Sequence, residues 1–397
     1  MATPQFLPPS NAEDTNRFSP VDNEPLLHWE RVLRLAPEHG LGVVRRAIFF
    51  ALVTWVPIAI WSLVRGRFID AAVGEPLLQH YGVHVRCLVA IPMFILGEAT
   101  LNQAALRYLP QFITSGIVDD ISRPRFEAAI REFRRRRRSL VPWLIVISTA
   151  LAWTFIDRPV THADELSWAI EENGGLGFGG VWFSYVVRPI FEILLLGWLW
   201  RIGLLAMQFV RFSRMGLSLV PSHPDRAGGL GFLERLPTAF GPVSLGLSAM
   251  LASRWAHQIV HHNMSLDALK MPAAVFIIVW SLVLFLPLAG LMPLLHAAKR
   301  AALPGYAAMV AEQGRLVRRR WIDRTSNADA PLLEPAGIGP IADAATMYGQ
   351  VKAMRILPIG KMSLIAVLLP IVVPIVIVAA IQIPVGKMLL GLVHALM

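Results

Sequence analysis

The sequence predicts an all-α polytopic membrane protein, a bundle of about seven transmembrane helices with cytoplasmic helical extensions. The first reason is composition: 55% of the 397 residues are hydrophobic, the mean hydropathy is +0.54 and only 16% are charged. Soluble domains carry roughly 25% charged residues. The second reason is the pattern, in which long apolar runs alternate with short charged loops. Because lipid offers no hydrogen-bond partners, each run must satisfy its own backbone groups and therefore forms a helix.

Each apolar run is near the ~20 residues that a bilayer-spanning helix needs. A proline lies in or at the edge of every run, which predicts kinks because proline removes a backbone hydrogen bond. Pro370 and Pro374 could divide the last run into two halves. The predicted spans are 46–64, 84–106, 140–156, 181–203, 239–260, 272–297 and 362–382.

The chain divides into three parts. Residues 1–25 are rich in proline, asparagine and acidic residues, which is typical of a disordered tail. Residues 26–45 interleave apolar and charged side chains and predict an interfacial amphipathic helix on the inner membrane surface. Residues 46–397 form the seven-span domain, whose charged segments 107–138 and 298–361 extend into the cytoplasm as helices. The second segment suits a small helical subdomain or an assembly surface, and is too small for an independent enzyme.

The basic residues predict the orientation in the membrane. Of the 37 lysines and arginines, 28 lie in segments that face the cytoplasm if the N-terminus is inside, and five lie in the opposite loops. We therefore expect a bacterial inner-membrane protein with a cytoplasmic N-terminus and a periplasmic C-terminus. The net charge of +10 then faces the cytoplasm, where anionic lipid head groups are the expected partner. The consecutive arginines Arg134 to Arg138 fit a stop-transfer anchor better than a nucleic-acid site.

The sequence contains no motif for catalysis. Cys87 is the only cysteine and lies in a predicted span, which excludes disulfides within the chain and cysteine metal sites. The first 45 residues lack the apolar core and cleavage site of a signal peptide, so we expect the first span to be retained. We predict no catalytic residue and no cofactor apart from the divalent metal considered below, and we favour a protein that is not an enzyme while keeping a metal-dependent enzyme as an alternative.

Six charged side chains lie inside the predicted spans, where each costs at least ~2.5–3.5 kcal/mol. Such residues usually pair, line a wet cavity or mark an ion path. Arg188 and Glu192 are four residues apart and lie on one helix face. They form either a neutralised pair that fixes helix packing or a gated ion pair. Arg201, near the cytoplasmic end, is expected to reach the lipid head groups. The six are Arg86, Glu98, Arg188, Glu192, Arg201 and Arg254, and the polar pathway that we predict comprises Glu98, Arg188, Glu192, Arg254 and His257.

Two histidine pairs predict a divalent-metal site, as an alternative to interfacial histidines that only hydrogen-bond loops. His80 and His84 lie at the outer end of the second span, and His257 and His261 lie at the same level of the fifth. Both imidazoles of a pair spaced by four residues can reach one ion. If a metal binds, we expect a tetrahedral site of these four histidines. Nearby acids would form a funnel toward it: Asp70, Glu75, Asp164, Glu171 and Glu172.

The loop between the fourth and fifth spans, residues 222–232, is the most motif-like stretch of the chain. Its glycines permit positive φ angles and close backbone approach, and free N–H groups there could cradle an anion. It is not a P-loop, because no Gly-Lys-Ser/Thr follows. It is either a structural turn that caps the fifth span or an inner gate or ligand loop, formed by His223, Asp225, Arg226, Gly228 and Gly229.

The order of the elements is similar to that of insect chemoreceptor channels. Both have seven spans, an N-terminus inside and a cytoplasmic helix that leads into the last span. This resemblance concerns topology alone. It implies a homo-oligomer whose subunits surround a pore lined by the last span, with Gln382 near the outer mouth.

Three function classes follow from these observations. The first is transport or conduction of a small ion or solute along the polar pathway, with the loop 222–232 as inner gate. Protonation of Glu192 or His257 would be the coupling step, because histidine titrates near physiological pH. The second is a non-transporting sensor or assembly protein that signals through its basic cytoplasmic helices. The third is a metal-dependent enzyme near the outer face. We expect no nucleic-acid partner.

Overall fold

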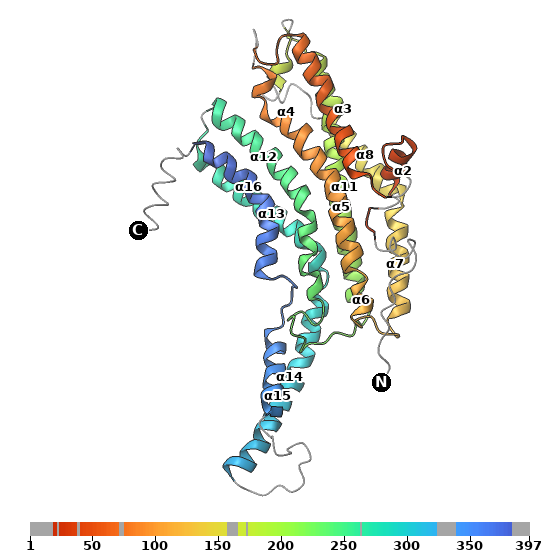
Figure 1. Ribbon diagram of the computed structural model, residues 1–397, viewed down its shortest axis with the longest axis vertical. Helices are drawn as coiled ribbons and strands as arrows, with labels where there is room; N and C mark the ends of the chain where they lie inside the picture. Colours follow the sequence, from red (N-terminus) through yellow and green to blue (C-terminus); the bar gives the residue numbers. More distant parts are fainter. Residues whose placement is uncertain are drawn as a thin grey trace, which may run out of the picture.

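The protein is helical, and no β-strand occurs among the residues that the structure describes. In the computed structural model the helices form one long bundle, and a helical pair projects from one end of it (Figure 1). In the part of the chain that the structure describes, seven helical runs are long and apolar enough to cross a membrane. The predicted fold class, an all-α polytopic bundle, is therefore confirmed. The structure describes residues 19–21, 24–37, 40–70, 75–156, 166–171, 174–262, 264–323 and 339–382, so most of the predicted tail 1–25 lies outside it.

Three spans form the centre of the bundle: α5 (Ile91–Tyr108), α11 (Arg188–Ser213) and α12 (Gly241–His262). In their most apolar stretches, 50–56% of the residues are buried. Each is lengthened at its start by shorter helical pieces. These are α4 (Tyr81–Val85) and the π-helical turn Arg86–Ala90 before α5, α10 (Phe178–Trp182) and the π-helical turn Phe183–Val187 before α11, and the 3₁₀ helix η7 (Gly231–Phe240) before α12.

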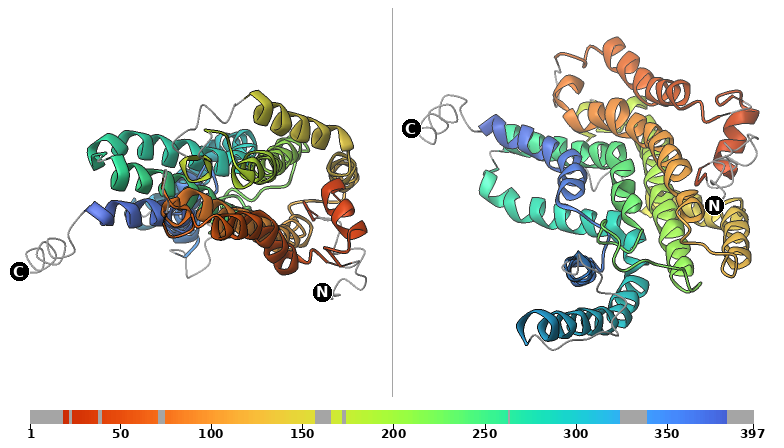
Figure 2. Two further views of the ribbon diagram at one scale, coloured as in Figure 1. Left: turned by 90° about the horizontal axis from the view of Figure 1, so that it is seen from above. Right: turned by 60° about the horizontal axis from the view of Figure 1, so that its bottom comes forward.

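Four spans surround this centre, with only 22–28% of the residues in their apolar stretches buried. They are α3 (Val43–Val64), α8 (Leu140–Ile156), α13 (Leu266–Ala289) and α16 (Lys361–Gln382). Seen from above, α13 and α16 lie toward one side of the bundle and α3 and α8 toward the other (Figure 2). Their outward faces expose large aliphatic side chains, such as Leu144 of α8 and Ile278 of α13. Such apolar surface is expected to contact lipid.

The sixth span ends earlier than the sequence predicted. We predicted 272–297, whereas α13 ends at Ala289 and a new helix, α14 (Met292–Val317), follows. Gly290 at this break lies against α11, where a Cβ atom would be 2.9 Å from the backbone nitrogen of Val210. Prolines at 287 and 293 lie on either side of the break and favour a helix end and a helix start. The apolar run therefore crosses a helix boundary, which hydropathy alone does not reveal.

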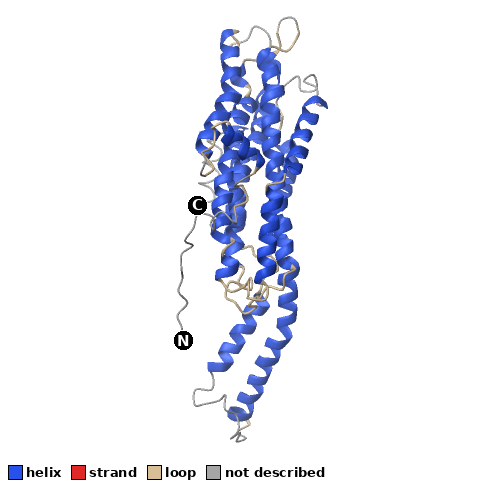
Figure 3. Cartoon of the chain, turned by 90° about the vertical axis from the view of Figure 1, so that its right-hand side faces the viewer, coloured by secondary structure: helices blue, strands red, loops and turns tan. Residues whose placement is uncertain are grey.

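α14 and α15 (Gly339–Ala353) lie side by side and project beyond the bundle, and we call this pair the hairpin (Figures 1 and 3). Most of its described side chains are exposed, and so are the basic Arg318 and Arg319 in the π-helical turn (Arg318–Ile322) that follows α14. Val351 and Met354 are buried at its base. The end of the bundle that carries the hairpin is the hairpin end, and the end where α4 begins is the distal end.

The N-terminal segment lies against the bundle near α8. Its helix α2 covers Pro25–Val32, which is shorter than the predicted helix 26–45. The helix is amphipathic, but its exposed face is apolar and its buried face is acidic. Trp29 is exposed on its outer face, whereas Glu30 and the preceding Glu24 are buried. The inward face therefore carries acidic groups, which need partners inside the bundle.

Gly97 on α5 lets the three central spans approach one another closely. A Cβ atom there would lie 2.8 Å from Val243 of α12 and 2.9 Å from Trp198 of α11. One turn later, the hydroxyl of Thr100 donates to the carbonyl of Ala239 at 2.6 Å. Small residues at such crossings are typical of packed transmembrane helices.

Candidate functional site

A group of one glutamate and three histidines lies at the distal end of the bundle. We call it the His–Glu cluster: Glu75, His80, His257 and His261. His257 and His261 are one turn apart near the end of α12, so both face the same side of that helix. His80 directly precedes α4, and Glu75 lies in the loop before it. Two segments distant in sequence, the loop 75–80 before α4 and the end of α12, thus meet at one point.

The Glu75 carboxylate lies at the centre of this cluster. Its Oε2 is 3.3 Å from His80 Nε2 and 3.6 Å from His257 Nε2. Its Oε1 is 3.5 Å from His261 Nδ1. The ring centroids of His257 and His261 are 4.6 Å apart, and those of His80 and His257 are 5.2 Å apart. One donor atom each of Glu75, His257 and His261 lies within 4.8 Å of the others, so one ion can contact all three.

His84 is held by other partners. Its Nδ1 accepts a hydrogen bond from Trp55 Nε1 at 2.9 Å, and its Nε2 lies 3.0 Å from the carbonyl of Leu77, to which it donates. Both ring nitrogens are engaged, so neither is available to a metal in this arrangement. The structure therefore brings together three of the four predicted histidines and adds Glu75, which the sequence placed only in the funnel. Of the other funnel acids, Asp70 is exposed, Glu171 pairs with Arg65 at 3.3 Å, and Asp164 and Glu172 lie outside the described residues.

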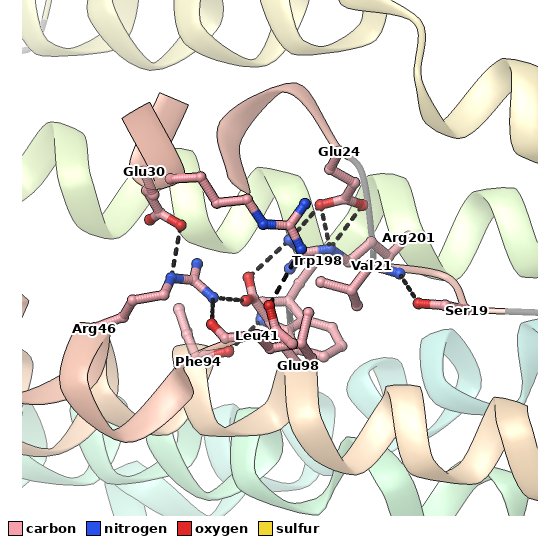
Figure 4. A network of polar contacts seen from close by, with 12 residues as sticks. Ser19, Val21, Glu24, Glu30, Leu41, Arg46, Phe94, Glu98, Trp198 and Arg201 are labelled. Atoms are coloured by element: carbon pink, nitrogen blue, oxygen red, sulfur yellow. Dashed lines mark hydrogen bonds and ion pairs between the residues drawn. The ribbon is translucent and has the colours of Figure 1, made fainter. Parts of the chain in front are cut away.

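A second cluster, which we call the ion-pair chain, alternates in sign as Glu24–Arg201–Glu98–Arg46–Glu30 (Figure 4). Arg201 of α11 lies 2.6 Å from Glu24 and 2.8 Å from Glu98 of α5. Arg46 of α3 lies 2.5 Å from Glu98 and 2.6 Å from Glu30. Every one of these side chains is at most 5% exposed. Each arginine lies between two carboxylates, and the N-terminal segment supplies two of the three carboxylates.

Burial raises the pKa of both carboxyl groups that the N-terminal segment supplies, Glu24 and Glu30. It raises the pKa of Glu30 to about 7, although Arg46 opposes the shift. Burial also raises the pKa of Glu24, against the attraction of Arg201. The folded protein therefore keeps a proton on Glu30 that the unfolded chain loses above its ordinary pKa of 4.5. The stability from this group is complete below that pH and is lost as the pH rises to about 7, by up to ~3 kcal/mol.

The residues of the predicted polar pathway occupy three different environments. Glu98 belongs to the ion-pair chain, and His257 belongs to the His–Glu cluster. Along the helical run from α4 to α5, these two clusters are roughly 27 Å apart at 1.5 Å per residue. Arg188 and Glu192 are half-buried on α11, and Arg254 is exposed on α12. Glu98 and His257, two members of the predicted pathway, therefore belong to separate clusters.

Two intramembrane arginines are buried beside aromatic rings. Arg201, which we expected at the lipid head groups, is only 2% exposed, and its guanidinium lies 5.2 Å from the Trp198 ring centroid. Arg86 lies in the π-helical turn before α5, with its guanidinium 4.8 Å from the ring centroid of Phe183. Cation–π attraction contributes at such desolvated positions. Arg201 is stable inside the bundle mainly because Glu24 and Glu98 neutralise its charge, so its guanidinium does not need to reach the lipid head groups.

The loop 222–232 is built around the side chain of Asp225. Its Oδ1 accepts hydrogen bonds from the backbone N–H groups of Ala227 at 2.8 Å and Gly229 at 3.2 Å, and its Oδ2 accepts one from Gly231 at 2.7 Å. Burial works to raise the pKa of Asp225, but these N–H groups outweigh it and hold the pKa below its ordinary value. The loop thus uses its own N–H groups, which favours a structural turn over an anion cradle.

The same loop connects the bundle to the base of the hairpin. The Arg226 carbonyl accepts a hydrogen bond from the Arg355 N–H at 2.7 Å, with Arg226 at a φ of +56°. The Arg355 side chain donates to the Asp225 carbonyl at 3.1 Å and lies 3.4 Å from the Glu234 carboxylate. We call this set of contacts the latch. Of the other loop residues named from the sequence, Gly228 lies against Met354, Gly229 donates to Asp225, and His223 lies 2.9 Å from the Asp225 carboxylate.

Sequence reasoning missed the partners that complete both clusters. Glu24, Glu30 and Arg46 lie outside or at the edge of the predicted spans, so no depth argument selected them. One signal was present: apart from Arg46 at the edge of the first span, the spans contain four arginines but only two glutamates. Because buried charges need counter-charges, acids from outside the spans had to enter the bundle. Glu75 offered no such signal, since only the fold brings its loop to α12.

No known protein family, no curated protein and no solved structure matches this chain.

Proposed function

We propose that this chain is a multi-pass protein of a bacterial inner membrane, with its N-terminus and hairpin in the cytoplasm and its C-terminus in the periplasm. The excess of basic residues at the hairpin end, in α7 (Arg123–Arg137) and the hairpin, supports this orientation. The His–Glu cluster then faces the periplasm, and the basic residues face anionic lipids. Homo-oligomer formation stays a prediction from the topology.

We further propose that the protein is a sensor that carries a signal from the His–Glu cluster to the hairpin. One observation supports this role: the helical run η7–α12 extends from the latch to the cluster. Glu234 of the latch lies in η7, and His257 and His261 lie near the end of α12. The run is roughly 50 Å long. A ligand that draws the two histidines toward Glu75 would tilt or turn this run and so displace the latch.

The last span gives the signal a second route to the hairpin. α16 packs along α12, and the Ser248 hydroxyl of α12 donates to the Ile371 carbonyl of α16 at 2.5 Å. At its start, Ser363 donates a hydrogen bond to the Glu234 carbonyl. Because α16 follows directly on the segment that leaves the hairpin, movement of α12 acts on the hairpin through both the latch and this span.

A distance measurement tests the sensor role without a ligand. Spin labels at Ser115→Cys on the bundle and Ala311→Cys on the hairpin, in a Cys87→Ala background, report their separation in lipid nanodiscs. Both labelled positions are exposed. We expect Glu75→Gln and His257→Gln to shift or broaden the distance distribution. Asp70→Asn, which changes an exposed residue at the same end, is the matched control. Identical distributions in all folded variants would show that the cluster does not communicate with the hairpin.

Transport is the second candidate, and the ion-pair chain favours it. Without Glu24 and Glu30, the bundle would present Arg46, Arg201 and Glu98, an excess of one positive charge, to the space that the N-terminal segment occupies. The segment would then close a route for an anion. Current across a planar bilayer in mixed salts between pH 5 and 8 tests this idea. Deletion of residues 1–35 should raise the current. If neither the deletion variant nor the full chain conducts, the result would argue against a conducting route.

A further inference from the structure

We propose that Glu75, His257 and His261 bind one divalent transition-metal ion of the zinc class from the periplasmic side. This inference names the ligand of the His–Glu cluster and, for its signalling role, rests on the proposed function. Two imidazoles and one carboxylate form a donor set that suits Zn²⁺, which binds nitrogen and oxygen ligands in a tetrahedral arrangement.

The distances between the donor atoms are the main support for a metal site. A tetrahedral ion at 2.0–2.1 Å from its ligands separates them by roughly 3.3–3.4 Å. Glu75 Oε2 and His257 Nε2 are 3.6 Å apart, and Glu75 Oε1 and His261 Nδ1 are 3.5 Å apart. These separations exceed the 2.7–3.2 Å of ordinary N–H···O hydrogen bonds. Glu75 Oε2 is a buried atom for which the described residues give no hydrogen bond. The two histidines face different oxygens of Glu75, and one donor atom from each of the three residues lies within 4.8 Å of the others, so a small movement of the side chains closes the set around one ion.

The surroundings allow an ion to enter and to be held. The side chains of Glu75, His257 and His261 are 31%, 14% and 19% exposed, so the site is open on one side. His80 is nearly buried and lies behind it, with its Nε2 3.3 Å from Glu75 Oε2 and 3.1 Å from the Ser167 hydroxyl. Such an outer partner orients a metal-binding carboxylate. Three protein ligands leave a fourth position for water or for His80 after a small rotation.

Metal binding to the purified full chain tests this proposal. The protein is prepared without a histidine tag, and Zn²⁺ binding is measured by titration calorimetry. Co²⁺ replaces Zn²⁺ for visible spectroscopy, which reports tetrahedral coordination. We expect one ion per chain and tetrahedral Co²⁺ bands. Because loss of a mere outer-shell partner already costs 10–100-fold in affinity, Glu75→Gln, His257→Gln and His261→Gln should each lose at least roughly tenfold. Unreactive Cys87, which is buried in the folded protein, shows that each variant is folded.

His84→Gln is the most informative control, because the four-histidine site predicted from the sequence requires His84 and the structure does not. We expect normal affinity for this variant and for Asp70→Asn. No stoichiometric binding, or binding that all three ligand variants retain, would overturn the proposal. The spin-label experiment separates the two ideas. Metal binding with an unresponsive hairpin would refute the sensor role alone, and a responsive hairpin in a chain that binds no metal would refute the metal site alone.

Discussion

Substitution of Arg201 by methionine should destabilise the folded protein by about 3–5 kcal/mol. Arg201 is 2% exposed and holds two carboxylates, Glu24 at 2.6 Å and Glu98 at 2.8 Å. At an effective dielectric constant of 20, an ion pair at 4 Å contributes about 4 kcal/mol. Loss of two such pairs exceeds the ~2 kcal/mol that burial of a methionine returns. Glu98 keeps Arg46, whereas Glu24 keeps no partner within the ion-pair chain.

A second substitution tests the electrostatic reason. The double variant Arg201→Met/Glu24→Gln has the same net charge in the ion-pair chain as the wild type, and should recover at least half of the lost stability. Arg211→Met on the same helix is the matched control. Arg211 is 34% exposed and lies 3.8 Å from Glu132, so its loss should cost less than about 1 kcal/mol.

The only cysteine provides the assay. Cys87 is fully buried, so maleimide reacts with it only when the bundle opens. In detergent micelles, a loss of 3 kcal/mol should accelerate labelling by about 100-fold. Labelling of Arg201→Met as slow as that of Arg211→Met would refute the predicted loss of stability. Faster labelling of the double variant than of the single variant would refute the charge argument.

Three further predictions concern the N-terminal segment, the helix crossing and the latch. Glu30→Gln should remove most of the loss of stability between pH 4.5 and 7, measured by denaturation at several pH values; an unchanged pH slope would contradict the raised pKa. Gly97→Leu should lower stability in thermal unfolding by about 1–3 kcal/mol or more. Gly203→Leu, where an added Cβ meets nothing within 4 Å, should have a smaller effect, and equal effects would refute the packing argument. Arg355→Ala should speed chymotryptic cleavage near Leu357 compared with Lys352→Ala, and equal rates would show that the latch does not hold this segment.

The helices were largely predictable because their signal is local. A run of apolar residues in lipid has one way to satisfy its backbone, so six of the seven predicted spans fall within helical runs of the structure. The exception, 272–297, failed where Gly290 packs against α11. That contact is between distant segments, and hydropathy does not register it.

The candidate sites were predictable only in part, for the same reason. Helical spacing was enough to pair His257 with His261, since both residues are on one helix. It gave no means to choose between His84 and Glu75 as their neighbour, because that choice depends on how a loop folds over the distal end.

The sequence by itself determined that the chain is a membrane helix bundle, and that its intramembrane arginines outnumber the acids. Only the tertiary structure decided which charges neutralise them. Glu24 and Glu30 enter from a segment that precedes the spans, and they reach Arg201 and Arg46 because α2 lies against the bundle. Ion pairs and metal ligands act over a few ångströms, whereas the contacts Arg46–Glu98, Arg201–Glu24 and Glu75–His257 each join residues from distant parts of the sequence. Local pattern fixes the helices, and long-range packing fixes the chemistry between them.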